Sequence, residues 1–133
     1  MSSKFDWLAL VPLCLVLTAC SSGEIAVKEA AQQRWNALVD GDLHTAYQHY
    51  TDAFKKEVPL RYYRKQVKGV GLWSKAKVDA VRCDDAGNSC DAQVEITVAM
   101  KMRGLADPVE TTDVVNETWV REGVFSDWRY LKK

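Results

Sequence analysis

The chain has 133 residues, with 18 Lys and Arg against 18 Asp and Glu, and 47% of its residues are hydrophobic. This length fits one domain, and the neutral balance excludes functions that depend on a basic surface. Nucleic-acid binding requires a local excess of Lys and Arg, yet no run of more than two basic residues occurs. We therefore expect no nucleic-acid partner.

Residues 1–19 differ in composition from the rest and predict an export signal. Lys4 precedes an uncharged stretch from Trp7 to Ala19, which is well short of the roughly 20 residues that span a bilayer as a helix. A short basic segment, an apolar segment and small residues before a cleavage site are typical of signal peptides. A buried core helix is the alternative, but Pro12 in the middle of the stretch argues against it.

The run Leu17-Thr18-Ala19-Cys20 resembles the lipobox of bacterial lipoproteins. The resemblance implies cleavage before Cys20, a diacylglycerol on its sulfur, and usually a fatty acid such as palmitate on the freed amine. Two or more acyl chains give stable membrane anchoring. Ser21 stands where an Asp usually retains Gram-negative lipoproteins in the inner membrane, so the resemblance implies an outer-membrane anchor with the domain facing the periplasm. Residues 20–23 would form the lipidated tether.

Three helical segments are predicted next. Apolar residues recur at steps of three and four from residue 27 to residue 38, which predicts a helix ending near Gly41. Asp42 can cap a second helix over residues 43–50, and Pro59 fits the first turn of a third over residues 60–67. Core packing is the simplest interpretation of the aromatic residues on these stripes. Those residues are Trp35, Tyr47, Tyr50 and Tyr63.

A meander of four strands is predicted after the helices. Between residues 90 and 102 every even position is apolar or small, while the odd positions are mostly polar. This alternation predicts a long strand with one buried face. Gly104 and Pro108 predict a loop, and Glu122-Gly123 predicts a tight turn into the last strand. The predicted strands are residues 75–83, 90–102, 111–121 and 124–131.

Cys83 and Cys90 predict a structural disulfide in an oxidising compartment. They flank a turn-rich hexapeptide between two strands. A zinc site is the alternative, but two cysteines without a nearby histidine lack a ligand set. A redox-active pair is a second alternative, and the Cys-x-x-Cys spacing is missing.

The disulfide also predicts a β-bulge. If Cys83 faces Cys90 in simple antiparallel pairing, Asp79 points into the core. An extra residue near Ala80–Val81 would return Val78 to the buried face and bend the strand.

The segment from Arg34 to Tyr47 resembles the opening of the nuclear transport factor 2-like superfamily, in which a long helix ends in Gly-Asp and a second begins with an Ala-Tyr-type pair. Tyr50-Thr51-Asp52, Tyr62-Tyr63 and the late segment Glu117–Gly123 extend the similarity. The resemblance implies an α+β domain over residues 24–133, with N-terminal helices packed in a strongly curved, cone-shaped, four-stranded antiparallel sheet that encloses a cavity.

No catalytic residue, metal site or cofactor is predicted. The buried parity of the long strand carries no ionisable residue except Cys90. His44 and His49 are five residues apart, so they do not share a helix face as a metal pair would. The sequence contains no phosphate-binding loop or nucleophile elbow. The helices could still supply an acid or base to an enzyme, from Asp40, Tyr47, Tyr50 or Tyr63.

These features favour a non-catalytic accessory or binding module of the cell envelope, held at the outer membrane by Cys20 and contacting an envelope protein. The alternative is a protein whose cavity binds a small apolar ligand or acts like an isomerase or dehydratase. The sequence leaves the oligomeric state open. The candidate pocket residues are Trp35, Tyr47, Tyr50, Tyr63, Met100 and Trp119.

Overall fold

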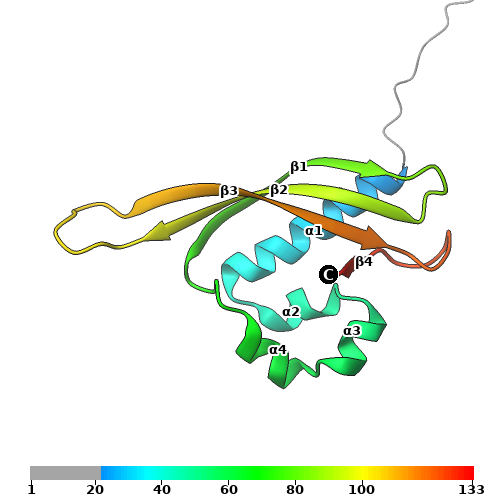
Figure 1. Cartoon of the computed structure of the whole chain (residues 1–133), viewed down its shortest axis with the longest axis horizontal. Helices are drawn as coiled ribbons and strands as arrows, with labels where there is room; N and C mark the ends of the chain where they lie inside the picture. Colours follow the sequence, from blue (N-terminus) through cyan, green and yellow to red (C-terminus); the bar gives the residue numbers. More distant parts are fainter. Residues whose placement is uncertain (1–21) are drawn as a thin grey trace, which may run out of the picture.

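The computed structural model describes residues 22–133, which form four helices followed by four strands (Figure 1). The predicted signal peptide and Cys20 lie outside the described residues. The helices are α1 (Ser22–Asp40), α2 (Leu43–Gln48), α3 (Asp52–Glu57) and α4 (Leu60–Gln66). The strands are β1 (Trp73–Cys83), β2 (Ser89–Met100), β3 (Val109–Val120) and β4 (Arg129–Leu131). The predicted α+β class and four-stranded antiparallel sheet are therefore confirmed, with strand order β1-β2-β3-β4.

Helix α1 packs against the sheet through one apolar stripe. It begins at Ser22, inside the segment predicted to be a tether, and ends where Gly41 adopts a φ of 77°. This left-handed conformation costs glycine little, and it lets the Gly41 amide donate to the Leu38 carbonyl at 3.2 Å. The buried members of the stripe are Val27, Ala31, Arg34, Trp35 and Leu38.

The three short helices α2, α3 and α4 connect the end of α1 to the start of β1. Asp42 caps α2 as predicted, because its side chain accepts from the Thr45 amide. Helix α3 was not predicted, so the expectation of three helices is wrong. Thr51 caps α3 by accepting from the Phe54 amide at 3.3 Å. A six-residue helix with no buried side chain has no apolar stripe to find.

The predicted bulge in β1 is present. The register shifts between Val78 and Ala80, so Asp79 is the extra residue, one position before the predicted site. Beyond the bulge Val81 pairs with Ala92, and before it Val78 is buried on the inner face of the sheet. The bulge thus keeps the apolar side chains on both sides of Asp79 facing the helices.

A glutamine of α1 covers the free edge of β1. The side-chain amide of Gln32 donates to the carbonyl of Ala76 at 2.9 Å and accepts from the amide of Val78 at 3.0 Å. Gln32 therefore takes the place of a neighbouring strand on an edge that would otherwise expose unpaired backbone groups.

The structure contains the predicted disulfide between Cys83 and Cys90. The two residues are direct partners across β1 and β2. The Asp84 carboxylate accepts from the amides of Asn88 and Ser89 and orders the connecting turn.

The last strand is shorter than predicted. Residues 124–128 form a loop, and only Arg129–Leu131 pair with β3. Gly123 does not have a positive φ, whereas a two-residue hairpin turn of the favoured types requires one. The loop instead buries Trp128, whose ring lies 4.7 Å from the Arg121 guanidinium.

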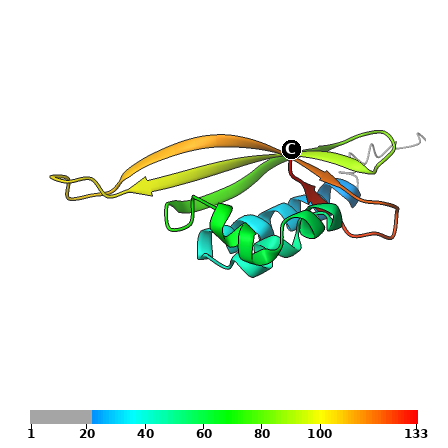
Figure 2. The same ribbon diagram turned by 60° about the horizontal axis from the view of Figure 1, so that its bottom comes forward.

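The helices cover one face of the sheet, and the sheet is not strongly curled around them (Figure 2). The expected strongly curved cone is therefore wrong in this respect. The β2–β3 hairpin extends past the helices at the end opposite the β3–β4 loop (Figure 1). Among residues 22–133, none of the helices has the length and apolar character needed to cross a bilayer.

Candidate functional site

A cavity of about 250 Å³ lies between the helices and the inner face of the sheet. Its walls consist of aromatic rings and one buried ion pair, and two lysines also line it. The wall residues are Arg34, Trp35, Leu38, Tyr50, Tyr63, Val67, Trp73, Val115, Glu117 and Tyr130, with Gln66, Lys68 and Lys132. A wider surface hollow of about 330 Å³ near Thr51 and the β3–β4 loop is lined mostly by polar side chains. The half-open cavity lined by aromatic rings has the character expected of a ligand site.

The floor of the cavity is an ion pair between Arg34 of α1 and Glu117 of β3. Arg34 Nη1 donates to Glu117 Oε1, and the side chains of the two residues are 6% and 1% exposed. Arg34 lies on the buried stripe of α1, one position before Trp35. Glu117 pairs with Ala92 and lies on the same inward parity as Val115 and Trp119. Local periodicity therefore turns both charges inward, where they meet.

Glu117 accepts hydrogen bonds from two indoles as well as from Arg34. Trp35 Nε1 donates to Oε1 at 2.9 Å, and Trp119 Nε1 donates to Oε2 at 3.1 Å. Both carboxylate oxygens are therefore occupied by protein donors. This arrangement satisfies a buried charge and fixes two tryptophan rings, and it leaves Glu117 poorly placed to accept a proton from a substrate.

Arg34 is enclosed by aromatic rings. Its guanidinium lies 4.0 Å from the ring centre of Tyr130, 5.1 Å from Tyr50 and 5.4 Å from Trp35, and Nη2 donates to the Tyr50 hydroxyl at 3.0 Å. Burial alone would lower the pKa of Arg34, but Glu117 and the neighbouring tyrosines raise it above its ordinary value. Arg34 is therefore a permanent cation whose charge is largely compensated.

Two buried polar atoms at the cavity have no hydrogen-bond partner among the described residues. They are the hydroxyl of Tyr63 and Nε of Arg34. Tyr63 is 1% exposed, and its ring lies 5.2 Å from the rings of Tyr47 and Tyr50. Burial, together with the nearby Tyr50, raises the pKa of Tyr63 above its usual value, so Tyr63 is a neutral donor at physiological pH. Buried polar groups normally have partners, but neither atom is exposed to the cavity, so a molecule bound there does not contact them in this arrangement of side chains.

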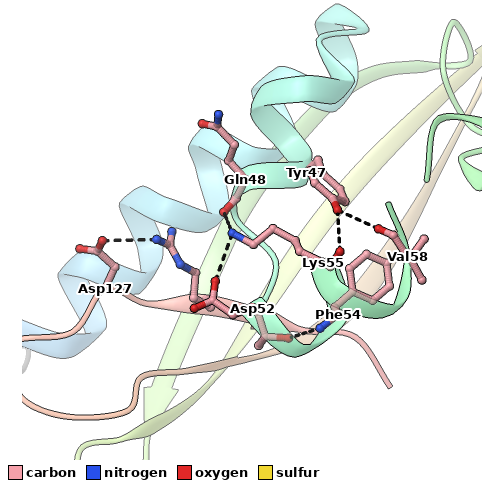
Figure 3. Close-up of polar contacts among 9 residues, drawn as sticks. Tyr47, Gln48, Asp52, Phe54, Lys55, Val58 and Asp127 are labelled. Carbon is pink, nitrogen blue, oxygen red and sulfur yellow. Dashed lines mark hydrogen bonds and ion pairs between the residues drawn. The ribbon is translucent and has the colours of Figure 1, made fainter. Parts of the chain in front are cut away.

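Tyr47 packs against Tyr63, with 5.2 Å between the ring centroids. The Tyr47 hydroxyl donates to one of the carbonyls of Lys55 and Val58, which lie at 3.1 and 2.8 Å, and this contact ties the C-terminal end of α3 to α2 (Figure 3). Lys55 in turn bonds the Gln48 carbonyl at 3.5 Å and pairs with Asp52 at 3.4 Å (Figure 3). The polar group of Tyr47 is thus engaged in connecting the short helices.

Gly69 lies directly against the ring of Trp73, another aromatic residue in the wall of the cavity. A Cβ on Gly69 would overlap the ring of Trp73. That ring meets Trp35 edge-on, with 5.5 Å between centroids. Gly69 therefore leaves the space that Trp73 occupies at the cavity.

The structure brings together three of the six candidate pocket residues: Trp35, Tyr50 and Tyr63 line the cavity. Tyr47 and Trp119 pack behind it. Met100 does not line it, because β2 runs past the helices at this point and leaves Met100 43% exposed. His49 lies beside Trp119, at 6.1 Å between ring centroids, and burial with nearby cations lowers its pKa.

The sequence interpretation missed Arg34, Glu117, Trp73 and Tyr130 as cavity residues. The available signal was an ionisable residue on an apolar stripe: Arg34 lies three residues after Ala31, and Glu117 lies between Val115 and Trp119 in strand parity. We found no cluster of three or more potential metal ligands within residues 22–133.

Comparison with known proteins adds little to this geometry. Neither a protein-family model nor a curated protein sequence matches the chain. One similar solved structure is a candidate polyketide cyclase from Xanthomonas campestris pv. campestris, at 15% sequence identity and a TM-score of 0.37. The similarity covers 84% of this chain and 93% of the other. At that TM-score the likeness carries no argument about fold or activity, so the proposal below is based on the cavity itself.

Proposed function

We propose that the domain is a non-catalytic binding protein that holds a small, largely apolar molecule in the cavity between the helices and the sheet. The observation that carries this proposal is the cavity of about 250 Å³, whose walls are mainly aromatic and apolar. Sites of roughly 300 Å³ or more are usual for drug-sized ligands, so this volume suits a molecule of one or two rings.

The buried polar groups support binding in preference to catalysis. A general base needs a free lone pair and a pKa near the working pH. Both oxygens of Glu117 already accept hydrogen bonds, and the raised pKa of Tyr63 makes it a poor proton donor in a neutral solution. The cavity therefore offers a ligand mainly aromatic and apolar surface.

The same proposal includes the cellular setting. The lipobox-like sequence ending at Cys20 supports an outer-membrane lipoprotein facing the periplasm, and the order of motifs supports a nuclear transport factor 2-like domain. Replacing Cys20 with Ala and fractionating the envelope tests the anchor. Release into the periplasmic fraction is expected, and continued membrane association of the variant would contradict it.

A second candidate function is an accessory module that contacts an envelope protein. The observation that favours it is the extended β2–β3 hairpin, which exposes Met100, Met102 and Leu105 beyond the helices. Flexible apolar side chains suit adaptable protein contacts. Ligand binding in the cavity and contact through the hairpin use different residues, so substitutions separate them.

Titration with 2-naphthol, followed by quenching of tryptophan fluorescence, tests the cavity. Val115 lines the cavity, whereas its neighbour Val114 lies on the opposite face of β3 and is 47% exposed. We expect saturable quenching that Val115→Phe abolishes and that Val114→Phe, the matched control, leaves unchanged. Leu38→Phe fills the cavity from the helix side and should act like Val115→Phe. Equal binding by the folded cavity-filling variants would refute the proposal.

A further inference from the structure

We propose that the tip of the β3–β4 loop inserts into the head-group layer of the membrane that carries the lipid anchor, and so sets the orientation of the domain on that membrane. The loop covers residues 121–128, between β3 and β4, and its tip is Val124 and Phe125. This inference rests on the cellular setting proposed above, in which Cys20 is lipidated. Three observations support it: the exposure of the tip, the contacts that hold the loop, and the end of the domain at which it lies.

The tip exposes two adjacent apolar side chains. Among the large apolar side chains of residues 22–133, Phe125 and Val124 are the most exposed, at 102% and 71%. Transfer of such side chains from water to an apolar phase is favourable. Because the Phe125 ring is fully exposed, this transfer gives up almost no contact within the domain. An exposed apolar pair of this kind indicates a contact surface.

The base of the loop is fixed while its tip is left exposed. Arg121 Nε donates to the Gly87 carbonyl at 2.9 Å, and Nη1 donates to the Val124 carbonyl at 3.4 Å. The guanidinium also lies 4.7 Å from the ring centre of Trp128, which is 8% exposed. Arg121 therefore ties the loop to the β1–β2 turn and to a buried ring, so folding the tip back onto the domain would break these contacts.

The tip lies at the end of the domain from which the chain continues to Cys20. Val124 and Phe125 share a surface hollow with Ala26 and Ala30 of α1. The loop lies at the same end as the start of α1 in both views, and the β2–β3 hairpin lies at the opposite end (Figure 1 and Figure 2). An anchor at Cys20 therefore brings the loop, and not the hairpin, to the membrane.

The connection to the anchor is short enough to bring this end of the domain to the lipid. Cys20 is two positions before Ser22, where α1 begins, so their Cα atoms are at most about 7 Å apart. Ala26 follows after a helical rise of about 6 Å. The head-group layer on each side of a bilayer is about 5–7 Å thick. These lengths are similar, so a loop beside Ala26 is within reach of the layer.

The charges near the tip favour insertion of apolar side chains over attraction to anionic lipid. Residues 121–129 contain two arginines and two acidic residues, and Arg129 pairs with Asp127 at 3.4 Å. The neighbouring β1–β2 turn adds Asp84 and Asp85. The loop and this turn together have no excess of positive charge. Insertion should therefore depend neither on anionic lipid nor on salt.

A fluorescent dye at the tip tests the contact. Of the four cysteines, Cys83 and Cys90 are joined, Cys20 would carry the lipid, and Cys14 would leave with the signal peptide. Phe125→Cys thus supplies one free thiol for an environment-sensitive dye. The full chain is produced with its signal, purified from the membrane fraction, and reconstituted in vesicles of phosphatidylethanolamine and phosphatidylglycerol without other proteins. We expect strong quenching of the dye by lipids brominated in their acyl chains, unchanged by high salt or by omission of phosphatidylglycerol.

Two controls assign the quenching to the apolar tip. Leu105→Cys carries the same dye on the β2–β3 hairpin, where Leu105 is 57% exposed, and this dye should remain in water. Val124→Asp in the protein labelled at residue 125 should weaken insertion by at least about tenfold, because it removes apolar surface and adds a charge. Val114→Asp makes the same substitution on the outer face of β3, where Val114 is 47% exposed, and should leave the quenching unchanged.

The outcomes separate this inference from the setting on which it rests. If the dye at residue 125 is quenched no more than the dye at residue 105, membrane insertion is refuted and the lipid anchor stands. Shielding of residue 125 in native envelopes but not in pure lipid vesicles would assign the tip to a protein contact and likewise refute insertion. Quenching that disappears at high salt would refute the apolar mechanism. If the purified chain carries no lipid at Cys20, the proposed setting fails and the inference fails with it.

Discussion

The ion pair between Arg34 and Glu117 makes a quantitative prediction about stability. Glu117→Ala leaves the buried guanidinium without a counter-charge and two indole N–H groups without their acceptor. Removing one partner of a buried pair costs about 3–5 kcal/mol, and the two orphaned donors place this variant at the upper end. A domain of this size has a total stability of about 5–15 kcal/mol, so the loss is a large fraction of the whole.

A double-mutant cycle isolates the interaction. Arg34→Met and Glu117→Gln should each cost about 3 kcal/mol, because each leaves the other charge buried and unpaired. The double variant removes both charges and keeps one amide oxygen as acceptor for an indole, so it should cost clearly less than the sum. We expect a coupling free energy of about 2–3 kcal/mol, from urea unfolding curves with unchanged slope.

A solvent-exposed pair in the same sheet provides the control. Lys77 and Asp79 lie 3.8 Å apart, with the Lys77 side chain 67% exposed. The cycle Lys77→Gln with Asp79→Asn should give a coupling of about 1 kcal/mol or less. A coupling for the Arg34 and Glu117 cycle as small as this control would refute the claim that the pair is a desolvated element of the cavity.

Three further predictions concern the disulfide, a histidine and a glycine. Replacing Cys83 and Cys90 together with Ala should lower the free energy of unfolding by roughly 2.5 kcal/mol, measured by urea unfolding, since the closed loop is short. Burial and nearby cations lower the pKa of His49 below 6.5; the unfolded state therefore binds the proton more readily, and stability should be lost as pH falls from about 6.5 through the lowered value. His49→Gln should remove this slope in unfolding midpoints measured across that range. Gly69→Ala should displace the Trp73 ring, change the near-ultraviolet circular dichroism and weaken 2-naphthol binding.

Each of these three predictions has an outcome that contradicts it. Gly123→Ala is the matched control for Gly69→Ala, because Gly123 has no positive φ and its added Cβ would meet only Ser126 Oγ at 3.9 Å; equal effects of the two substitutions would refute the stacking argument. An unchanged pH slope in His49→Gln would show that His49 titrates alike in the folded and unfolded states. A cysteine double variant as stable as the parent would show that the disulfide does not constrain the unfolded chain.

The features that could be predicted from the sequence are those encoded by neighbouring residues. Strict alternation over β2 identified a strand with one buried face, and the conflict between Asp79 and the disulfide located a bulge to within one residue. The short helix α3 was missed because one cap, Thr51, defines it and no apolar stripe accompanies it. The last strand was overextended because burial of Trp128 holds the loop away from β3.

The cavity could be predicted only in part because its polar centre joins residues far apart in the chain. Arg34 and Glu117 are separated by 83 positions, so neither local sequence shows that the two charges meet. Trp35 and Tyr63 lie on helices, and Tyr50 follows α2 directly on the predicted stripe, so pattern analysis could find these three, whereas Trp73 and Tyr130 reach the cavity through tertiary packing. Periodicity shows which way a side chain points, and it does not show what lies opposite.

Stability alone gives little reason for a charged pair at this position. Apolar residues of similar volume often stabilise a core at least as well as a buried ion pair, and the cavity leaves unfilled space that larger side chains would occupy at a gain. What the pair does provide is orientation: Glu117 fixes the indoles of Trp35 and Trp119, and Arg34 occupies the Tyr50 hydroxyl. Departures from the rules of core packing that converge on one cavity are expected where a protein binds something, and here they converge on the ring-lined volume between α1 and β3.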